Sequence, residues 1–224
     1  MTVSTDSDAS AQAGAPADGP ASSGAHRFGA GWIALALIVG ILLGAGAGFL
    51  GARTMGVPGD TSAEAGFLRD MSTHHAQAVE MSMIAHANST DPQIVTFAGD
   101  IALTQHGQIG TMHAWLRDWN LGPTGSEPAM AWMPDAQGSV RNGLMPGMAT
   151  PDQLATLSKA TGKDLDVQFL TLMRQHHLGG IHMAQAILDM TDNEDVRWLA
   201  GSMVRGQQSE INLIDSILKR IQTG

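Results

Sequence analysis

Apolar residues recur at helical spacing in four stretches of the chain, at residues 62–87, 93–119, 164–190 and 194–222. In each stretch they share one face of a helix with 3.6 residues per turn, which is the pattern of an amphipathic α-helix. Short polar turns join the stretches in two pairs, and each pair predicts an antiparallel helical hairpin. Two such hairpins predict an all-α fold, a four-helix bundle.

Local signals at the helix starts support these boundaries. Asp91 precedes Pro92, and an acidic cap followed by proline at the first helical position is a strong start signal. Asp192 is predicted to cap the last helix in a comparable way. A further short helix is expected from Pro151.

The two predicted hairpins are copies of each other at a constant offset of 102 residues. Between Phe67 and Leu116, 11 of 50 residues are identical to the residue 102 positions later, whereas chance would give about three. The repeat predicts one domain, residues 60–222, made of the units 62–119 and 164–222.

A long connector, residues 121–150, separates the repeats. It is dense in glycine and proline, which end helices and favour turns, so we expect irregular chain crossing the bundle. The connector is also rich in methionine, at Met130, Met133, Met145 and Met148.

The N-terminal part of the chain has a different character. Residues 1–30 are rich in Ala, Ser, Gly, Asp and Pro, and they have too few large apolar side chains to fold, so a disordered tail is predicted. Residues 31–52 carry no charge, and the segment 31–53 fits either one transmembrane anchor or a cleaved secretory signal. Both interpretations place the C-terminal domain outside the cytoplasm, on a single-pass anchor in the cell membrane or secreted.

Charge and composition narrow the classes of ligand. The net charge is −9, with only 12 Lys and Arg residues, which argues against nucleic-acid binding. The chain has no cysteine, so disulfides and thiolate metal sites are excluded. It has 14 methionines and 9 histidines, and a soft metal ion would have to bind to these.

The histidines and methionines form a repeated motif, Phe-Leu-x2-Met-x2-His-His-x5-Met. On a helix its members share one face, which should turn towards the bundle interior, where the small Ala78 and Gly180 leave room. Imidazole and thioether ligands without thiolate favour Cu(I). We therefore predict a copper site whose ligands are Met71, His74, His75, Met81, Met173, His176, His177 and Met183.

A structural interpretation competes with this one. The methionines would then fill the core, and the histidines would be satisfied by hydrogen bonds to Gln105, Gln207 or Glu210. The protein would be a structural or partner-binding bundle of the cell envelope without metal. A dimer is possible, and no protein partner is indicated by the sequence.

Other histidines and methionines are candidates for a secondary metal site. His86 follows His75 on nearly the same helical face, while His106 and His113 share an edge of the next helix. Met145 and Met148 are spaced like soft ligands, although they would also serve as apolar covering material.

Few residues support catalysis. A di-iron carboxylate site needs Glu-x-x-His on its helices, and the chain has none. Neither a nucleophile elbow nor a phosphate-binding glycine loop is present. We therefore predict a binding protein rather than an enzyme, with a copper- or iron-dependent oxidoreductase as the remaining alternative.

The doubled His-His motif, together with the connector sequence LMPGMATPDQLATLSKATGKDLDVQFL, resembles the DUF305 family over about residues 60–222. The resemblance implies a ferritin-like four-helix bundle in exported bacterial proteins, some of which bind copper or silver. It also implies the same eight motif residues as the metal site. One position departs from the family pattern, because Gln108 stands where glutamate is common, whereas Glu210 keeps it.

Overall fold

The computed structural model describes residues 38–44, 56–134, 136 and 138–223. The chain divides into two units, residues 1–55 and 56–224. The described residues form helices and loops, and their only extended pairing is one isolated bridge between Arg141 and Leu144. The predicted all-α class is therefore confirmed.

The second unit contains four long helices and one short helix. The first repeat supplies α2 (Ala63–Asn88) and α3 (Pro92–Asp118), and the second supplies α5 (Gly162–Met190) and α6 (Glu194–Thr223). The short helix expected from Pro151 is α4 (Pro151–Leu157). The periodicity thus predicted all four long helices to within two residues at each end.

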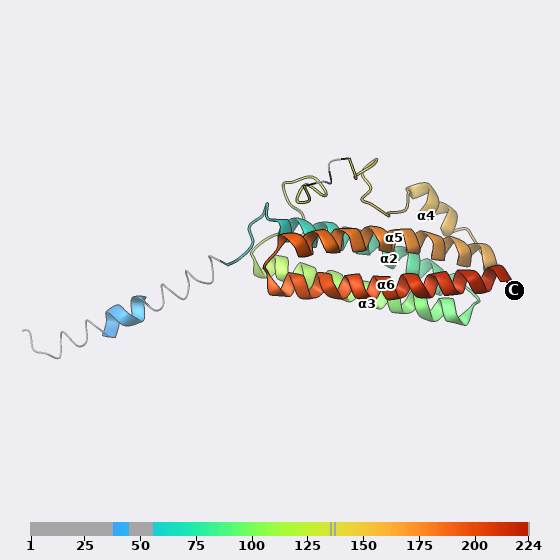
Figure 1. Ribbon diagram of the computed structural model, residues 1–224, viewed down its shortest axis with the longest axis horizontal. Helices are drawn as coiled ribbons and strands as arrows, with labels where there is room; N and C mark the ends of the chain where they lie inside the picture. Colours follow the sequence, from blue (N-terminus) through green and yellow to red (C-terminus); the bar gives the residue numbers. More distant parts are fainter. Residues whose placement is uncertain (1–37, 45–55, 135, 137, 224) are drawn as a thin grey trace, which may run out of the picture. The chain divides into compact units, whose positions relative to one another are not determined.

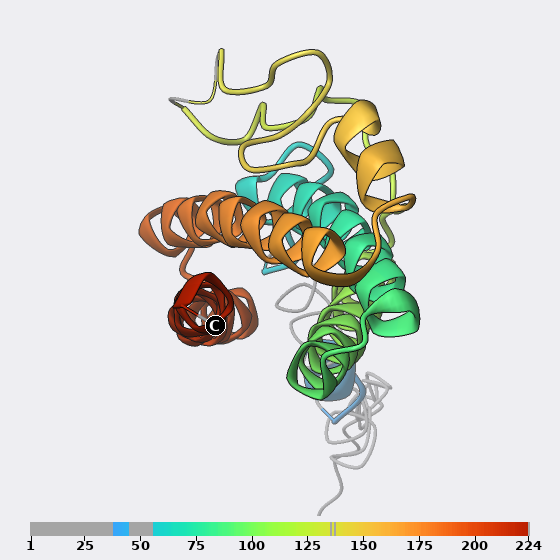
Figure 2. The ribbon, with the colours of Figure 1, turned by 90° about the vertical axis from the view of Figure 1, so that its right-hand side faces the viewer.

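The helices pack in two layers (Figures 1 and 2). Helix α2 packs against α3 and α5, and α5 packs against α6, so the two hairpins meet through α2 and α5. Figure 2 shows α3 and α6 on one side of the α2–α5 layer, with the connector and α4 on the other. Side chains of α2 and α5 can therefore contact α3 and α6 on one side and the connector on the other.

The predicted helix caps are right in one case and wrong in the other. The Asp91 carboxylate accepts a hydrogen bond from the Gln93 backbone N–H, as expected of a cap. In the second repeat the cap is Asn193, whose Oδ1 accepts from the Val196 N–H at 3.1 Å, and not Asp192. Asn193 is the repeat counterpart of Asp91, so the offset of 102 residues identifies the cap correctly.

Two repeat-equivalent hydrogen bonds fasten α2 to α5 at their ends. Thr191 donates to Glu64 Oε1 at 2.6 Å, and Ser89 donates to Asp166 Oδ1 at 2.6 Å. Each bond joins the start of one helix to the end of the other, so α2 and α5 run antiparallel. The offset of 102 residues converts one bond into the other, so the duplication in sequence is also an approximate twofold symmetry in structure.

The apolar core consists of two clusters, one towards each end of the bundle. The first cluster includes Met71, Met112 and Met183, and the second includes Met81, Phe97 and Met173. Neither cluster contains the polar residues in the middle of the four long helices. These polar residues form what we call the histidine layer: His74, His75, Gln105, Gln108, His176, His177, Gln207 and Glu210.

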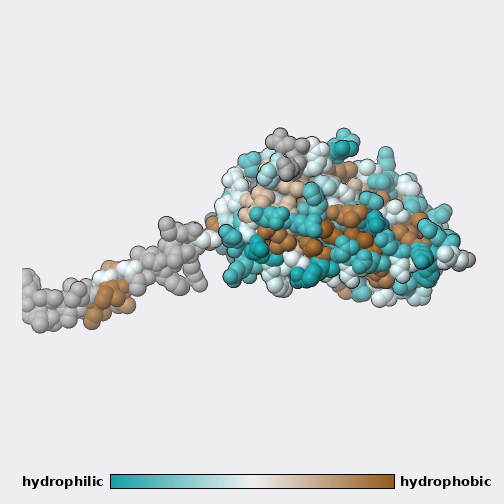
Figure 3. All heavy atoms as spheres, in the orientation of Figure 1, coloured by the Kyte–Doolittle hydropathy of each residue, from teal (hydrophilic) through white to brown (hydrophobic). Residues whose placement is uncertain are grey.

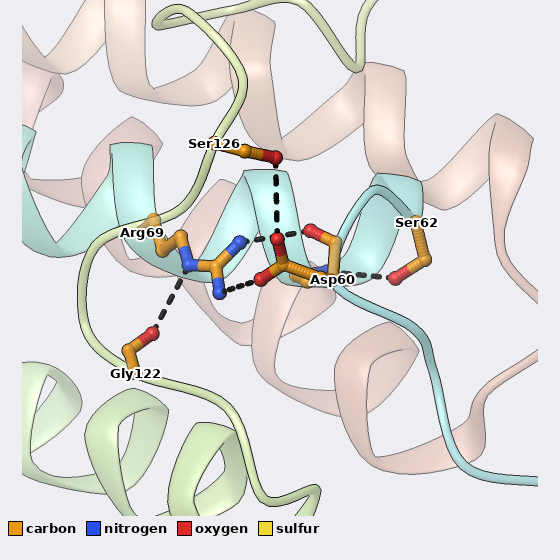
Figure 4. A network of polar contacts seen from close by, with 6 residues as sticks. Asp60, Ser62, Arg69, Gly122 and Ser126 are labelled. Carbon is orange, nitrogen blue, oxygen red and sulfur yellow. Dashed lines mark hydrogen bonds and ion pairs between the residues drawn. The ribbon is translucent and has the colours of Figure 1, made fainter.

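The start of the connector is fastened to α2 by Arg69 (Figure 4). Its guanidinium donates to the Asp60 carbonyl and carboxylate and to the Gly122 carbonyl, and Ser126 donates to the other Asp60 oxygen. Gly125 lies so close that a Cβ atom there would fall 2.3 Å from the guanidinium. Arg69 therefore joins the segment before α2 to the segment after α3.

The predicted membrane segment, residues 31–53, lies mostly outside the described residues. Within it, residues 38–44 are helical. Among the helices that the structure describes, none has the length and apolar character needed to span a membrane. The predicted disordered tail, residues 1–30, also lies outside the described part of the chain.

Candidate metal centre

The four motif histidines lie in the middle of α2 and α5, where both helices are covered on two sides. His74, His75 and His177 are fully buried, and His176 is 1% exposed. A buried imidazole needs partners for its two ring nitrogens, because an unpaired polar group in the interior is destabilising. The contacts of the eight ring nitrogens therefore define the site.

His74 and His176 are in direct contact between α2 and α5. Their ring centroids are 3.7 Å apart and the ring planes are tilted by 36°. His176 Nε2 lies 2.9 Å from the backbone oxygen of His74, and His74 Nε2 lies 3.1 Å from the carbonyl oxygen of Pro146 in the connector. The sequence repeat thus brings its two equivalent histidines together.

The other two histidines face the second helix of their own repeat. His75 Nε2 lies 2.7 Å from Gln108 Oε1, and His177 Nε2 lies 2.6 Å from Glu210 Oε2. Gln108 and Glu210 are repeat counterparts. Glu210 lies at an ion-pair distance from a histidine, but His177 Nε2 makes no hydrogen bond among the described residues. Gln108 was missed as a partner, although the offset of 102 residues points to it.

The two other predicted partners make no such contact. Both amide atoms of Gln105 are buried without a hydrogen-bond partner in the protein. Gln207 packs against Gly180, where a Cβ atom would fall 2.4 Å from Gln207 Oε1. The room that the sequence predicted beside Gly180 is therefore filled by the Gln207 side chain.

Three of these contacts fix the tautomer of the ring. The oxygens of Pro146, Gln108 and His74 accept hydrogen bonds, so Nε2 of His74, His75 and His176 carries the proton and donates it. His177 Nε2 lies at an ion-pair distance from Glu210 but makes no hydrogen bond among the described residues. All four Nδ1 atoms are buried with no partner in the described part of the protein, and unpartnered ring nitrogens gathered in one layer are suited to binding a cation.

Burial keeps three of these imidazoles neutral. It lowers the pKa of His74 to about 4 and that of His75 to about 3, and the neighbouring histidines lower the latter further. The pKa of His176 is also well below its usual value, first because of burial and then because of His74. The rings of His74, His75 and His176 are thus in the protonation state that metal coordination requires.

The four motif methionines are buried on both sides of the histidine layer. Met71 and Met183 belong to the first apolar cluster, and Met81 and Met173 belong to the second. Each cluster therefore contains one motif methionine from each repeat. The four predicted histidine ligands thus lie in the middle of the bundle, and the four predicted methionine ligands lie in the apolar clusters on either side of them.

The secondary candidates are placed differently. His86 is exposed, and its Nδ1 lies 2.8 Å from the Val95 carbonyl oxygen at the α2–α3 turn. His106 and His113 are exposed on α3.

Within residues 38–44 and 56–223, apart from 135 and 137, no three His, Asp or Glu side chains are close enough to hold a metal ion together.

The connector covers the histidine layer on the side opposite α3 and α6. Gln77 donates to the Ala149 carbonyl at 2.9 Å and accepts from its N–H at 2.7 Å. The backbone of Pro146 lies against Gly179, where a Cβ atom would fall 1.9 Å from the Pro146 oxygen. Met145 is buried and Met148 is half-buried beside this contact.

A separate cavity of about 410 Å³ lies at the start of α2. Its lining includes Asp60, Arg69, Asp70, Glu127 and Trp132, but none of the histidines. Burial raises the pKa of the Asp70 carboxyl, although its Oδ2 accepts hydrogen bonds from the Met130 N–H and the Trp132 indole. This cavity is therefore distinct from the histidine layer.

The fold and the site define a class: two repeated helical hairpins around a buried layer of histidines. The chain belongs to the DUF305 family, a domain of unknown function whose family model matches residues 64–218. The expected family membership is confirmed. No curated protein sequence matches the chain.

Solved structures share this fold. A protein from Streptomyces coelicolor described as a secreted DUF305 protein is 41% identical, with 73% of this chain and 96% of that chain covered and a TM-score of 0.67. A DUF305 fragment from Deinococcus radiodurans is 31% identical, with coverages of 73% and 99% and a TM-score of 0.60. CopM in its Cu(II)-bound form is 23% identical, with coverages of 71% and 97% and a TM-score of 0.55.

Proposed function

We propose that this protein is an exported metal-binding protein that holds Cu(I) in the histidine layer, for sequestration or transfer. The observation that carries the proposal is the set of four buried Nδ1 atoms without partners in the described part of the protein. The ligands would be the Nδ1 atoms of His74, His75, His176 and His177, with the thioethers of Met71, Met81, Met173 and Met183 on either side.

The contacts of the opposite ring nitrogens support this assignment. Histidines that bind metals commonly donate their other ring N–H to a carbonyl or carboxylate oxygen, which fixes the ring and makes the ligating nitrogen more basic. Nε2 of His74, His75 and His176 makes such a hydrogen bond, and His177 Nε2 lies 2.6 Å from the Glu210 carboxylate. These contacts support the proposed role of the opposite ring nitrogens as ligands.

Ligand softness supports copper over harder ions. Imidazole and thioether groups favour Cu(I), and carboxylates, which favour magnesium, calcium or manganese, are scarce in the layer. No three His, Asp or Glu side chains of the described residues lie close enough to hold an ion together, so the proposed binding requires the histidine side chains to move. CopM has also been solved in a Cu(I)-bound form and in a silver-bound form, and both ions are soft.

Export and membrane attachment are also part of the proposal. The uncharged segment 31–53 would anchor the chain, or would be cleaved to release it, and a related DUF305 protein is described as secreted. Fractionation of cells that express the full chain tests this, because an anchored protein stays with the membrane after a high-salt wash. We assign binding rather than catalysis to the site.

The test of metal binding is a titration of the full chain with Cu(I) against a competing chelator. A variant with His74, His75, His176 and His177 changed to asparagine should lose tight binding. A matched variant with the exposed His106, His113 and His182 changed to asparagine should bind as the wild type does.

Circular dichroism and gel filtration of each variant establish that it is folded. Equal Cu(I) affinity of wild type and folded quadruple variant would contradict the proposal and favour the structural interpretation. In that interpretation the histidines serve packing, and the bundle acts through a protein partner.

A further inference from the structure

The cavity of about 410 Å³ at the start of α2 has an excess of negative charge. Three carboxylates line it, those of Asp60, Asp70 and Glu127, together with one guanidinium, that of Arg69. The Arg69 guanidinium is bonded to Asp60 and to the Gly122 carbonyl (Figure 4). Asp70 and Glu127 therefore have no ion-pair partner among the described residues.

Asp70 is the carboxylate best suited to meet a ligand. Its Oδ2 accepts hydrogen bonds from the Met130 N–H at 2.7 Å and from the Trp132 indole at 2.8 Å, whereas no described residue donates to its Oδ1. Burial raises the pKa of this carboxyl, because the two donors and the nearby Arg69 only partly offset the cost of removing its charge from water. A positive group in the cavity would offset the remainder.

The cavity also marks the place where the two repeats differ. The core residues of this part of α2 recur 102 positions later, as Phe169, Leu170 and Met173. The residues of the same stretch that line the cavity do not recur: Gly66, Arg69, Asp70 and Thr73 correspond to Gln168, Thr171, Leu172 and Gln175. The difference between the repeats thus falls on the cavity wall and not on the core.

Specific contacts hold the wall of the cavity in place. A Cβ atom at position 66 would fall 2.6 Å from Trp132 Cδ1, so Gly66 allows the indole to lie against α2. Met130 has a φ of 66°, which is unfavourable for a residue with a side chain, and its N–H is held by Asp70. The cavity is therefore formed by the folded protein before any ligand binds.

We infer that this cavity binds a small aliphatic amine, whose ammonium group pairs with Asp70 and whose alkyl chain lies against Trp132, Pro123 and Pro128. An ammonium group donates three hydrogen bonds, and Asp70 Oδ1 and the Glu127 carboxylate supply charged acceptors. An indole ring is also the aromatic group that attracts cations most strongly. The volume lies within the range of small-molecule sites in proteins. This site is separate from the histidine layer and does not depend on copper binding.

The test is an NMR titration of the full chain with n-butylammonium chloride, followed through the indole 15N–1H resonance of Trp132, which Trp132→Phe assigns. The resonance should shift and saturate in the wild type. Asp70→Asn keeps an acceptor for Met130 and Trp132 but removes the charge, and it should weaken binding by about 10- to 100-fold. Glu127→Gln, at an exposed position, should weaken it by less than about 10-fold. Asp100→Asn removes an exposed carboxylate of α3 outside the cavity and should leave the affinity unchanged.

A titration with n-butanol, which has the same chain without the charge, distinguishes a cation site from an apolar pocket. Butanol should not saturate the shift over the range in which butylammonium does. An unshifted resonance with butylammonium, equal affinities of wild type and folded Asp70→Asn, or equal binding of butanol would each overturn the inference. Thermal unfolding checks that each variant folds. If Asp70→Asn does not fold, the comparison of Glu127→Gln with Asp100→Asn decides, and equal affinities of these two variants would overturn the inference.

Discussion

His74 and His176 stack against each other between α2 and α5, with ring centroids 3.7 Å apart. They are the same residue in the two repeats, and they meet where the approximate twofold symmetry of the domain brings α2 and α5 together. Two protonated rings at this distance would repel each other, and burial lowers the pKa of both rings. Folding thereby keeps both rings in the form that binds metal ions.

Removal of one of these rings should be costly for the fold. His176→Ala deletes a buried ring and its hydrogen bond to the His74 carbonyl, and we expect a loss of about 2–4 kcal/mol in the free energy of unfolding. His182→Ala removes an exposed ring from the same helix and should change the free energy of unfolding by less than about 0.5 kcal/mol. Urea unfolding measures this free energy for both variants, and similar losses would contradict the buried contact between His74 and His176.

Acid should destabilise the metal-free protein well above the range in which carboxylates titrate. In the unfolded chain histidine titrates near pH 6.5, whereas the folded pKa is about 4 for His74 and about 3 for His75, and that of His176 is also lowered. Between these values the unfolded state binds more protons, so stability is complete above pH 6.5 and falls as the pH decreases. Each ring contributes a slope of up to about 1.4 kcal/mol per pH unit.

Urea unfolding at several pH values between 7.5 and 5 tests this expectation. His176→Asn should reduce the slope by the contribution of one ring, because asparagine does not titrate. A slope that is the same in wild type and variant would show that His176 is not buried in neutral form.

The close approach of the connector to α5 predicts a contrast between two glycines. Gly179→Ala would place a Cβ atom 1.9 Å from the Pro146 oxygen, so the connector must move, at a cost of about 1–3 kcal/mol. Gly206→Ala lies in a helix with open space around it and should stabilise the protein by about 0.5–1 kcal/mol. Thermal unfolding should show a lower melting temperature for Gly179→Ala and a higher one for Gly206→Ala. Faster proteolysis of the connector in Gly179→Ala would locate the movement.

The two bonds that fasten α2 to α5 should contribute independently. Ser89→Ala removes the partner of Asp166, and Thr191→Val removes that of Glu64, each at a cost of about 1–3 kcal/mol. The bonds lie at opposite ends of a helix of 26 residues, roughly 40 Å apart. Their effects should therefore add to within about 0.5 kcal/mol in the double variant. A clear departure from additivity would mean that the ends of the bundle are coupled.

Much of this architecture could be predicted from the sequence because it is periodic. Apolar spacing located the four long helices, and the offset of 102 residues predicted two equivalent hairpins whose histidines meet. The same offset identifies Gln108 as the partner of His75 and Asn193 as the cap of α6. Both were missed because each residue was judged on its own chemistry rather than by its repeat counterpart.

The connector could not be predicted in the same way. Its path has no period, and it is determined by tertiary contacts such as those of Pro146 with Gly179 and of Ala149 with Gln77. The Nδ1 lone pairs were likewise beyond sequence reasoning, because the tautomer of each ring depends on which nitrogen meets an oxygen in the folded protein.

The most direct test of the metal centre is a long-range 15N–1H NMR spectrum of the histidine rings in the full chain, before and after addition of Ag(I) as a stable substitute for Cu(I). The metal-free spectrum should show His74, His75, His176 and His177 with the proton on Nε2 and none on Nδ1. On addition of the ion, the Nδ1 resonances of these rings should shift, and those of the exposed His106, His113 and His182 should not. Shifts confined to the exposed rings, or buried rings with the proton on Nδ1, would contradict the proposed copper site.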